Sequence, residues 1–196
     1  MKEEKQITSP EVLLSILILS TDDRLEFLER LIKRLEPQLN EFTEVLCDMG
    51  DGNIGFKRNK LVQKAVGKYV AFIDDDDLVS EDYVEQILKA IRMNPDCCEL
   101  NGIYYVDGVE QKPFKHSIFH GVDHTGNPYF EDGGAYYRCP NHLNAIKREI
   151  AIKYPFLELN HGEDTNFAIQ LFKDKALRTE GKIDKIIYHY YYRSNK

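Results

Sequence analysis

The first half of the chain alternates short apolar runs with segments whose apolar residues recur at helical spacing. Three runs have the length and composition of buried strands. The predicted strands cover residues 13–19, 43–47 and 68–73, and the predicted helices follow residues 20–23 as far as Pro37 and then cover residues 57–66 and 80–93. This alternation predicts an α/β fold with a mostly parallel central sheet and helices on both faces.

Acidic residues follow each of these three predicted strands. Asp74 to Asp77 come directly behind the third strand, Asp48 follows the second, and Asp22 and Asp23 follow the first. In open parallel sheets, ligands bind outside the carboxyl ends of the strands. Four adjacent carboxylates repel one another unless a cation is present. The run 74–77 is therefore either a divalent-metal site or a solvated turn that caps the next helix, and the convergence of three acidic strand ends favours the metal.

The second half is less regular. Residues 99–106 and 111–119 are predicted strands around a turn at Asp107 and Gly108, and residues 186–192 form a further predicted strand. Residues 120–134 are polar and glycine-rich, which is typical of a lid or an acceptor loop. Residues 144–154 and 163–174 have helical patterns.

Composition limits the classes of function. The chain has 196 residues and a formal net charge of -7, which disfavours a broadly basic nucleic-acid surface. The longest apolar stretch is too short to span a bilayer, and no apolar signal core follows the polar N-terminus. The four cysteines include no CxxC pair, so we expect reduced thiols. We therefore expect a cytoplasmic protein without a transmembrane segment.

Three segments together resemble the nucleotide-binding half of GT-A glycosyltransferases, especially those of family 2. The first is residues 17–24, a strand and its turn. The second is residues 52–77, which is similar to the family's succession of loop, helix and metal-binding strand end. The third is residues 162–168, Gly-Glu-Asp-Thr-Asn-Phe-Ala, which resembles the family's glutamate–aspartate motif at a helix start. The order and spacing of all three make the resemblance specific.

The resemblance implies a single GT-A, Rossmann-like domain over residues 11–196, preceded by a flexible leader at residues 1–10. A nucleotide-sugar-binding half would cover residues 11–110, and a smaller, irregular acceptor and catalytic half would cover residues 111–196. The implied activity is metal-dependent, inverting transfer of a sugar from a nucleotide-sugar, with UDP-sugars favoured. The acceptor is a hydroxyl of unknown origin, on a glycan, a lipid-linked sugar, a protein or a modified nucleic acid.

The resemblance also implies roles for individual residues. The implied donor-binding residues are Ser20, Thr21, Asp23, Asp48, Lys57, Arg58, Asp74 and Asp75. Asp74 and Asp76 would hold Mn²⁺ or Mg²⁺ against the diphosphate, and His189 would supply a third metal contact. Asp164 would act as general base with Glu163 beside it, and His142 and Tyr136 are weaker acceptor-side candidates.

Each role has a plainer alternative. Asp77 is predicted to be the N-cap before Ser80, and Arg58 has the alternative of an ordinary exposed helix charge. Asp164 and Glu163 also suit the first turn of any helix. His189 would equally suit a hydrogen-bonded structural histidine, and Tyr136 would suit core packing.

Two other kinds of protein remain open. One is a metal-dependent phosphatase with an aspartate nucleophile in the DxD motif, although Leu78 is not the small or β-branched residue expected after such a motif. The other is a non-catalytic nucleotide- or sugar-binding module on the same scaffold.

Overall fold

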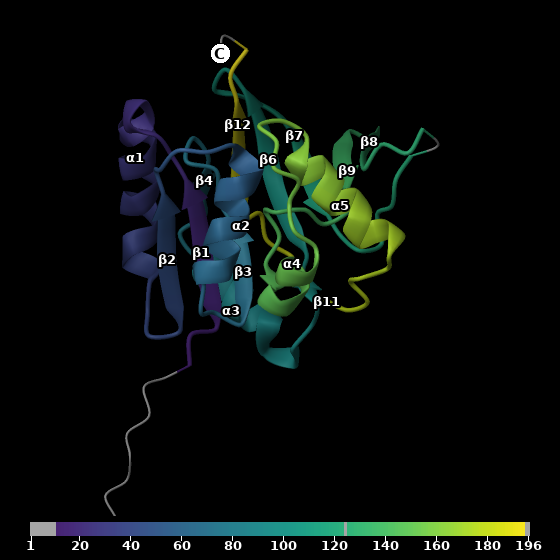
Figure 1. Cartoon of the computed structure of the whole chain (residues 1–196). Coiled ribbons are helices and arrows are strands. Elements are labelled where there is room, and N and C mark those ends of the chain that lie inside the picture. The colour runs from purple at the N-terminus through teal and green to yellow at the C-terminus, as the bar shows by residue number, and fades with distance from the viewer. Residues whose placement is uncertain (1–10, 124, 195–196) are drawn as a thin grey trace, which may run out of the picture.

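A six-stranded central sheet carries the three strands predicted in the first half of the chain. The computed structural model describes residues 11–123 and 125–194 (Figure 1). Strands β1 (Leu14–Leu19), β2 (Thr43–Asp48) and β3 (Tyr69–Phe72) lie parallel, with β1 between the other two. Three short strands complete the order β11-β5-β10-β3-β1-β2: β5 (Cys97–Cys98), β10 (Ile146–Lys147) and β11 (Glu180–Gly181). Only β10 runs antiparallel to its neighbours, so the prediction of a mostly parallel sheet is confirmed.

Helices cover both faces of the central sheet, as predicted. They are α1 (Leu25–Leu35), α2 (Ile54–Lys64), α3 (Tyr83–Ala90), α4 (Arg148–Lys153) and α5 (Glu163–Lys173). A hydrophobic core lies on each face of this sheet, and alternate residues of β1 point into one core or the other. Ile16 and Ile18 belong to the cluster that contains side chains of α1 and α3. Leu17 belongs to the cluster that contains side chains of α2, α4 and α5.

A second six-stranded sheet stands beside the first. Its order is β4-β12-β6-β7-β9-β8. The strands are β4 (Leu78–Val79), β6 (Leu100–Val106), β7 (Val109–His116), β8 (Tyr129–Asp132), β9 (Ala135–Arg138) and β12 (Tyr188–Tyr192). Strands β6, β7 and β12 match predicted strands. Strand β8 lies within residues 120–134, which the sequence predicted to be a loop, and β9 directly follows them.

Glycines have different roles at two places in the fold. The turn at Asp107 and Gly108 is confirmed, because both residues have positive φ, 49° and 80°, as a tight hairpin between β6 and β7 requires. Gly67 lies between α2 and β3, where a Cβ would stand 2.5 Å from Ser15 Oγ and 2.6 Å from the Ser15 backbone nitrogen. Close packing against β1 explains this glycine.

The two halves of the chain share both sheets. Strand β4 comes from the first half and lies in the second sheet, whereas β10 and β11 come from the second half and lie in the central sheet. The proposed boundary at residue 110 therefore remains a prediction, and the predicted leader at residues 1–10 lies outside the described residues. Among the residues that are described, no helix combines the length and the apolar character needed to cross a bilayer.

Candidate active site

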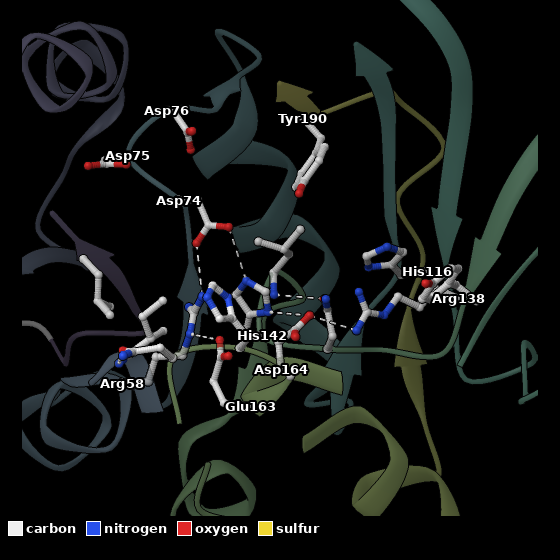
Figure 2. A pocket seen from close by; sticks show the side chains of 18 of the residues that line it. Arg58, Asp74, Asp75, Asp76, His116, Arg138, His142, Glu163, Asp164 and Tyr190 are labelled. Atoms are coloured by element: carbon white, nitrogen blue, oxygen red, sulfur yellow. Dashed lines mark hydrogen bonds and ion pairs between the residues drawn. The ribbon is translucent and has the colours of Figure 1, made fainter. Parts of the chain in front are cut away.

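A cavity of about 880 Å³ lies between the carboxyl edge of the central sheet and the second sheet. One wall carries the ends of β1 and β3 and the first turns of α2 and α5. The opposite wall carries side chains of β6, β7, β9 and β12. Figure 2 shows the acidic turn after β3 and the start of α5 facing the same space. The cavity therefore brings together the two acidic motifs, although they lie about 90 residues apart in the sequence.

Arg24 holds two of the four consecutive aspartates. Its Nη2 lies 2.5 Å from Asp75 Oδ1 and 3.0 Å from Asp76 Oδ2. Ser20 Oγ also donates to Asp75 Oδ2 at 2.6 Å. Both carboxylates are buried, so the guanidinium offsets part of their mutual repulsion. The positively charged side chain of Arg24 thus stabilises the acidic turn.

Arg58 joins the turn to the start of α5. Its Nη2 lies 3.2 Å from Asp74 Oδ1, and its Nε lies 3.3 Å from Glu163 Oε1. Its Nη1 is buried and has no hydrogen-bond partner among the described residues. With 5% of its surface exposed, Arg58 is not the exposed helix charge that was one alternative. It carries a positive charge at the wall of the cavity with one donor still unused.

His142 stands between the two acidic motifs. Its Nε2 lies 3.6 Å from Asp74 Oδ2, and its Nδ1 lies 3.9 Å from Asp164 Oδ2. Both ring nitrogens are buried and make no hydrogen bond within the described part of the chain. Burial alone would raise the pKa of Asp74, but Arg58 and His142 lower it below its usual value. Asp74 is therefore an ionised carboxylate facing the cavity.

Asp164 opens the first turn of α5 and is held by Arg138. The turn begins after Gly162, whose φ of 81° lies in the left-handed region. Arg138 Nη2 donates to Asp164 Oδ2 at 2.9 Å. Burial would raise the pKa of Asp164, but His142 and Arg138 outweigh it and lower the pKa. Asp164 therefore presents an ionised oxygen to the cavity at neutral pH.

Asp77 does not cap a helix, so the prediction of an N-cap is wrong. Asp82, not Asp77, precedes α3. Asp77 Oδ2 accepts from Tyr188 Oη at 2.7 Å, and its Oδ1 accepts from the Tyr191 backbone nitrogen at 2.7 Å. Burial, followed by the negative charge of Asp74, raises the pKa of Asp77. This carboxyl fastens β12 to the acidic turn.

The predicted base-pocket residues divide into two groups. Ser20, Thr21, Lys57 and Arg58 line the cavity. The Lys57 ammonium donates to the Ser20 carbonyl at 3.1 Å, which ties α2 to the end of β1. The described cavity lining does not include Asp23 or Asp48. Asp23 is exposed and accepts from Thr21 Oγ1, and Asp48 pairs with Lys60 at 2.8 Å.

His189 faces away from the cavity, and the structure therefore gives no support to it as a metal ligand. On β12 successive side chains point to opposite faces. Tyr190 lines the cavity, whereas His189 Nδ1 lies 3.2 Å from Tyr105 Oη on the other face. The alternative of a hydrogen-bonded structural histidine matches this placement. Tyr136, the weaker acceptor candidate, does line the cavity.

The sequence analysis gave no role to several side chains that line this cavity, among them Arg24, Tyr104, Arg138 and Tyr190. Arg24 belongs to the segment 17–24 that carries the family resemblance, but it was given no role. Arg138 stands two residues after Tyr136, so it shares that residue's face of β9. Strand alternation would have found Arg138 once Tyr136 was a candidate.

The donor chemistry of the acidic turn suits a hard divalent cation, although the protein alone forms no complete cage. Within the described residues, no group of three or more His, Cys, Asp and Glu side chains is arranged to hold a metal ion. Mg²⁺ commonly uses one or two carboxylates and completes its shell with water and substrate phosphates. Asp74 and Asp76 both line the cavity and provide such oxygens. These two residues therefore fit a cation that is shared with a phosphate-bearing ligand.

Comparison with proteins of known structure identifies the fold of this chain. The chain is similar to crystal structures of S. aureus TarS 1–349, with 16% identity. The TM-score is 0.59 for one of these structures and 0.56 for a complex with UDP-GlcNAc. These matches cover 92% and 94% of this chain and 60% of the TarS chain. The predicted GT-A fold is thereby confirmed.

Comparison of sequences gives the family. A segment of 82 residues is 29% identical to the glucosyl-dolichyl phosphate glucuronosyltransferase of Haloferax volcanii and covers 41% of this chain. The matched segment spans 26% of that protein, so the chain corresponds to only part of its length. The sequence profile of glycosyl transferase family 2 matches residues 20–157, which is most of the chain. The protein therefore belongs to glycosyl transferase family 2.

Proposed function

We propose that this protein is a metal-dependent, inverting glycosyltransferase that moves a sugar from a nucleotide-sugar to an acceptor hydroxyl. The observation that carries the proposal is that Asp74, Asp76 and Asp164 line one cavity. The first two suit a diphosphate with its cation, and the third suits a base for the acceptor. UDP-sugars are the first donors to test, because TarS, which shares the fold, has been crystallised with UDP and UDP-GlcNAc.

The donor would lie along the ends of β1 and β3. Ser20 and Thr21 line the cavity at the first of these ends and provide polar groups for the nucleoside. Arg58 brings a buried guanidinium with a free Nη1 donor, which suits a diphosphate oxygen. A divalent cation held by Asp74 and Asp76 would supply the positive charge that stabilises the leaving diphosphate.

Asp164 is the proposed general base. Its Oδ2 would take the proton from the acceptor hydroxyl while the acceptor oxygen attacks the anomeric carbon of the donor sugar. The bond from that carbon to the diphosphate breaks, and the nucleoside diphosphate leaves with the electron pair. His142 lies between Asp164 and Asp74, so acceptor and leaving group would stand on opposite sides of the transferred sugar. Attack from the far side inverts the anomeric centre.

Arg138 is expected to set the acid limit of this activity. Since His142 and Arg138 lower the pKa of Asp164 despite its burial, the base stays ionised below the ordinary aspartate value of 3.8. Replacing Arg138 by glutamine removes one of these charges, so the acid limb of the kcat/KM profile should move to higher pH. The matched control is Arg92→Gln, at an exposed position in the short 3-10 turn after α3. An unchanged acid limb in Arg138→Gln would contradict the role of this ion pair.

The proposal is tested by release of nucleoside diphosphate from a panel of UDP-, GDP-, CDP- and dTDP-sugars with Mn²⁺. We expect release from one nucleotide class, and none after chelation. Trapping of an aspartyl-phosphate on the protein would instead establish the phosphatase alternative. Tight nucleotide-sugar binding without any turnover, across a panel of acceptor glycosides, would favour the non-catalytic module.

A further inference from the structure

One face of the second sheet presents tyrosines to the cavity. The register pairs Tyr190 of β12 with Tyr104 of β6, and Phe114 of β7 with Tyr136 of β9. Tyr104, Tyr136 and Tyr190 all line the cavity, and we call these three residues the tyrosine platform. Figure 2 shows Tyr190 extending into the cavity on the side of Asp74. The platform therefore forms the wall opposite the proposed base.

The rings of the platform contact one another and keep part of their surface free. Tyr104 and Tyr190 are stacked, with ring centroids 5.5 Å apart and an interplanar angle of 17°. Tyr136 meets Tyr104 edge to face at 5.7 Å. All three side chains are only half-buried, so aromatic surface remains available to a ligand. Their mutual contacts hold the rings in place before anything binds.

The platform leads to the proposed base. Tyr136 and Arg138 lie two residues apart on the same face of β9, which is about 7 Å along a strand. Arg138 in turn holds Asp164 at 2.9 Å. A ring-shaped ligand that lies against Tyr136 would therefore have its edge toward Arg138 and Asp164.

The charged residues around the tyrosine platform favour some classes of ligand over others. The Lys112 ammonium lies 5.2 Å from the Tyr136 ring centroid and is paired with Glu131 at the outer end of the platform. Arg138 and Asp164 bound the inner end. An alkyl chain would desolvate these charged groups without pairing them. A single-stranded nucleic acid would need a basic groove along its backbone, whereas the chain has a net charge of -7. A ligand with apolar faces and a hydroxylated edge suits both features.

We infer that the tyrosine platform binds the acceptor and that the acceptor is a pyranoside, so that this protein adds a sugar to an existing carbohydrate. The inference rests on the proposed function and names its acceptor class. Because the rings of Tyr104 and Tyr136 are nearly perpendicular, the C–H face of the pyranose lies on one ring and its edge contacts the other. Its ring hydroxyls lie toward Arg138 and Asp164, which also line the cavity.

The test is saturation-transfer NMR with methyl pyranosides of glucose, galactose, mannose, N-acetylglucosamine and glucuronate as probes. Saturation of the tyrosine resonances should transfer to at least one of these glycosides in the wild type. Tyr104→Ala and Tyr136→Ala should each weaken its affinity about tenfold, whereas Tyr104→Phe, which keeps the ring, should bind normally. The matched control is Tyr105→Ala, since Tyr105 lies on the opposite face of β6 and stacks on Tyr191. This control should bind like the wild type.

A second arm separates acceptor from donor. If the platform binds the acceptor, Tyr104→Ala leaves the affinities for UDP and for the UDP-sugar unchanged. A selective loss of UDP-sugar affinity would assign the platform to the donor sugar and overturn the inference. Nucleotide binding without binding of any glycoside would also overturn it and leave the proposed function standing. Glycoside binding by a protein that binds no nucleoside diphosphate would overturn the transferase proposal itself.

Discussion

Replacing Asp164 by asparagine should lower kcat for sugar transfer by about 10²–10⁴-fold, the range that general-base catalysis supplies. Asparagine keeps the size of the side chain and the acceptor oxygen that Arg138 contacts at 2.9 Å. It cannot take up a proton from the acceptor hydroxyl. Affinity for the nucleoside diphosphate should stay within about twofold, because the proposed mechanism assigns Asp164 to the acceptor and not to the diphosphate. The measurement is transfer kinetics together with nucleotide binding by calorimetry.

The control for this prediction is Asp174→Asn, the same change at the other end of α5. Asp174 is exposed and is the C-cap of that helix, away from the cavity. It should retain full activity. If Asp164→Asn were as active as Asp174→Asn, the general base would have to be sought elsewhere in the cavity.

Replacing Asp77 by alanine should lower the free energy of unfolding by about 2–4 kcal/mol. The change leaves the Tyr188 hydroxyl and the Tyr191 backbone N–H without their acceptor. Each buried donor without a partner costs about 1–3 kcal/mol. Relief of the repulsion between Asp77 and Asp74 offsets part of this cost. Urea unfolding in the presence of a chelator measures the effect.

Asp77→Asn provides the control and adds a prediction about pH. Burial and the charge of Asp74 raise the pKa of Asp77 in the folded protein above its ordinary value of 3.8. The folded state therefore holds this proton more firmly than the unfolded state does. The resulting stabilisation is complete below about pH 4 and is lost as pH rises through the raised pKa. Asp77→Asn should thus gain stability relative to the wild type between pH 4 and pH 7. A constant difference over that interval would contradict the raised pKa.

Local pattern was sufficient for the central sheet and for much of the cavity. Buried parallel strands are continuous apolar runs, and their carboxyl ends meet at one edge of the sheet. The positions of the three strands therefore predicted that Asp22, Asp23, Asp48 and Asp74 to Asp77 lie at one edge of the sheet. Of these, Asp74, Asp75 and Asp76 line the cavity. Asp164 could be joined to them only through the family resemblance, because nothing local indicates that α5 returns to this edge.

Three strands of the second sheet were predicted, but the order of the sheet was not, because much of its pairing is not sequential. Strand β12 lies parallel to β6 and β9 lies parallel to β7, and neither pair is joined by a hairpin. Neighbouring side chains of β12 point to opposite faces of the sheet. The pairing of β12 with β6 therefore determines that Tyr190, and not His189, enters the cavity. The same long-range contact explains Asp77, whose hydroxyl donor Tyr188 lies 111 residues away in the chain. A cap residue and a buried acceptor look alike in sequence when the donor is so distant.

The most direct test of the account is thermal unfolding with UDP, GDP, CDP and dTDP, each with and without Mn²⁺. A ligand present at about 100 times its dissociation constant adds roughly 2.7 kcal/mol to the stability of the protein that binds it. We predict that one nucleotide, with UDP favoured, stabilises the protein only when the metal is present, and that Asp76→Asn abolishes this shift. Stabilisation that is the same without metal would contradict the role of Asp74 and Asp76. No stabilisation by any nucleotide with metal would contradict the proposal of a nucleotide-sugar donor.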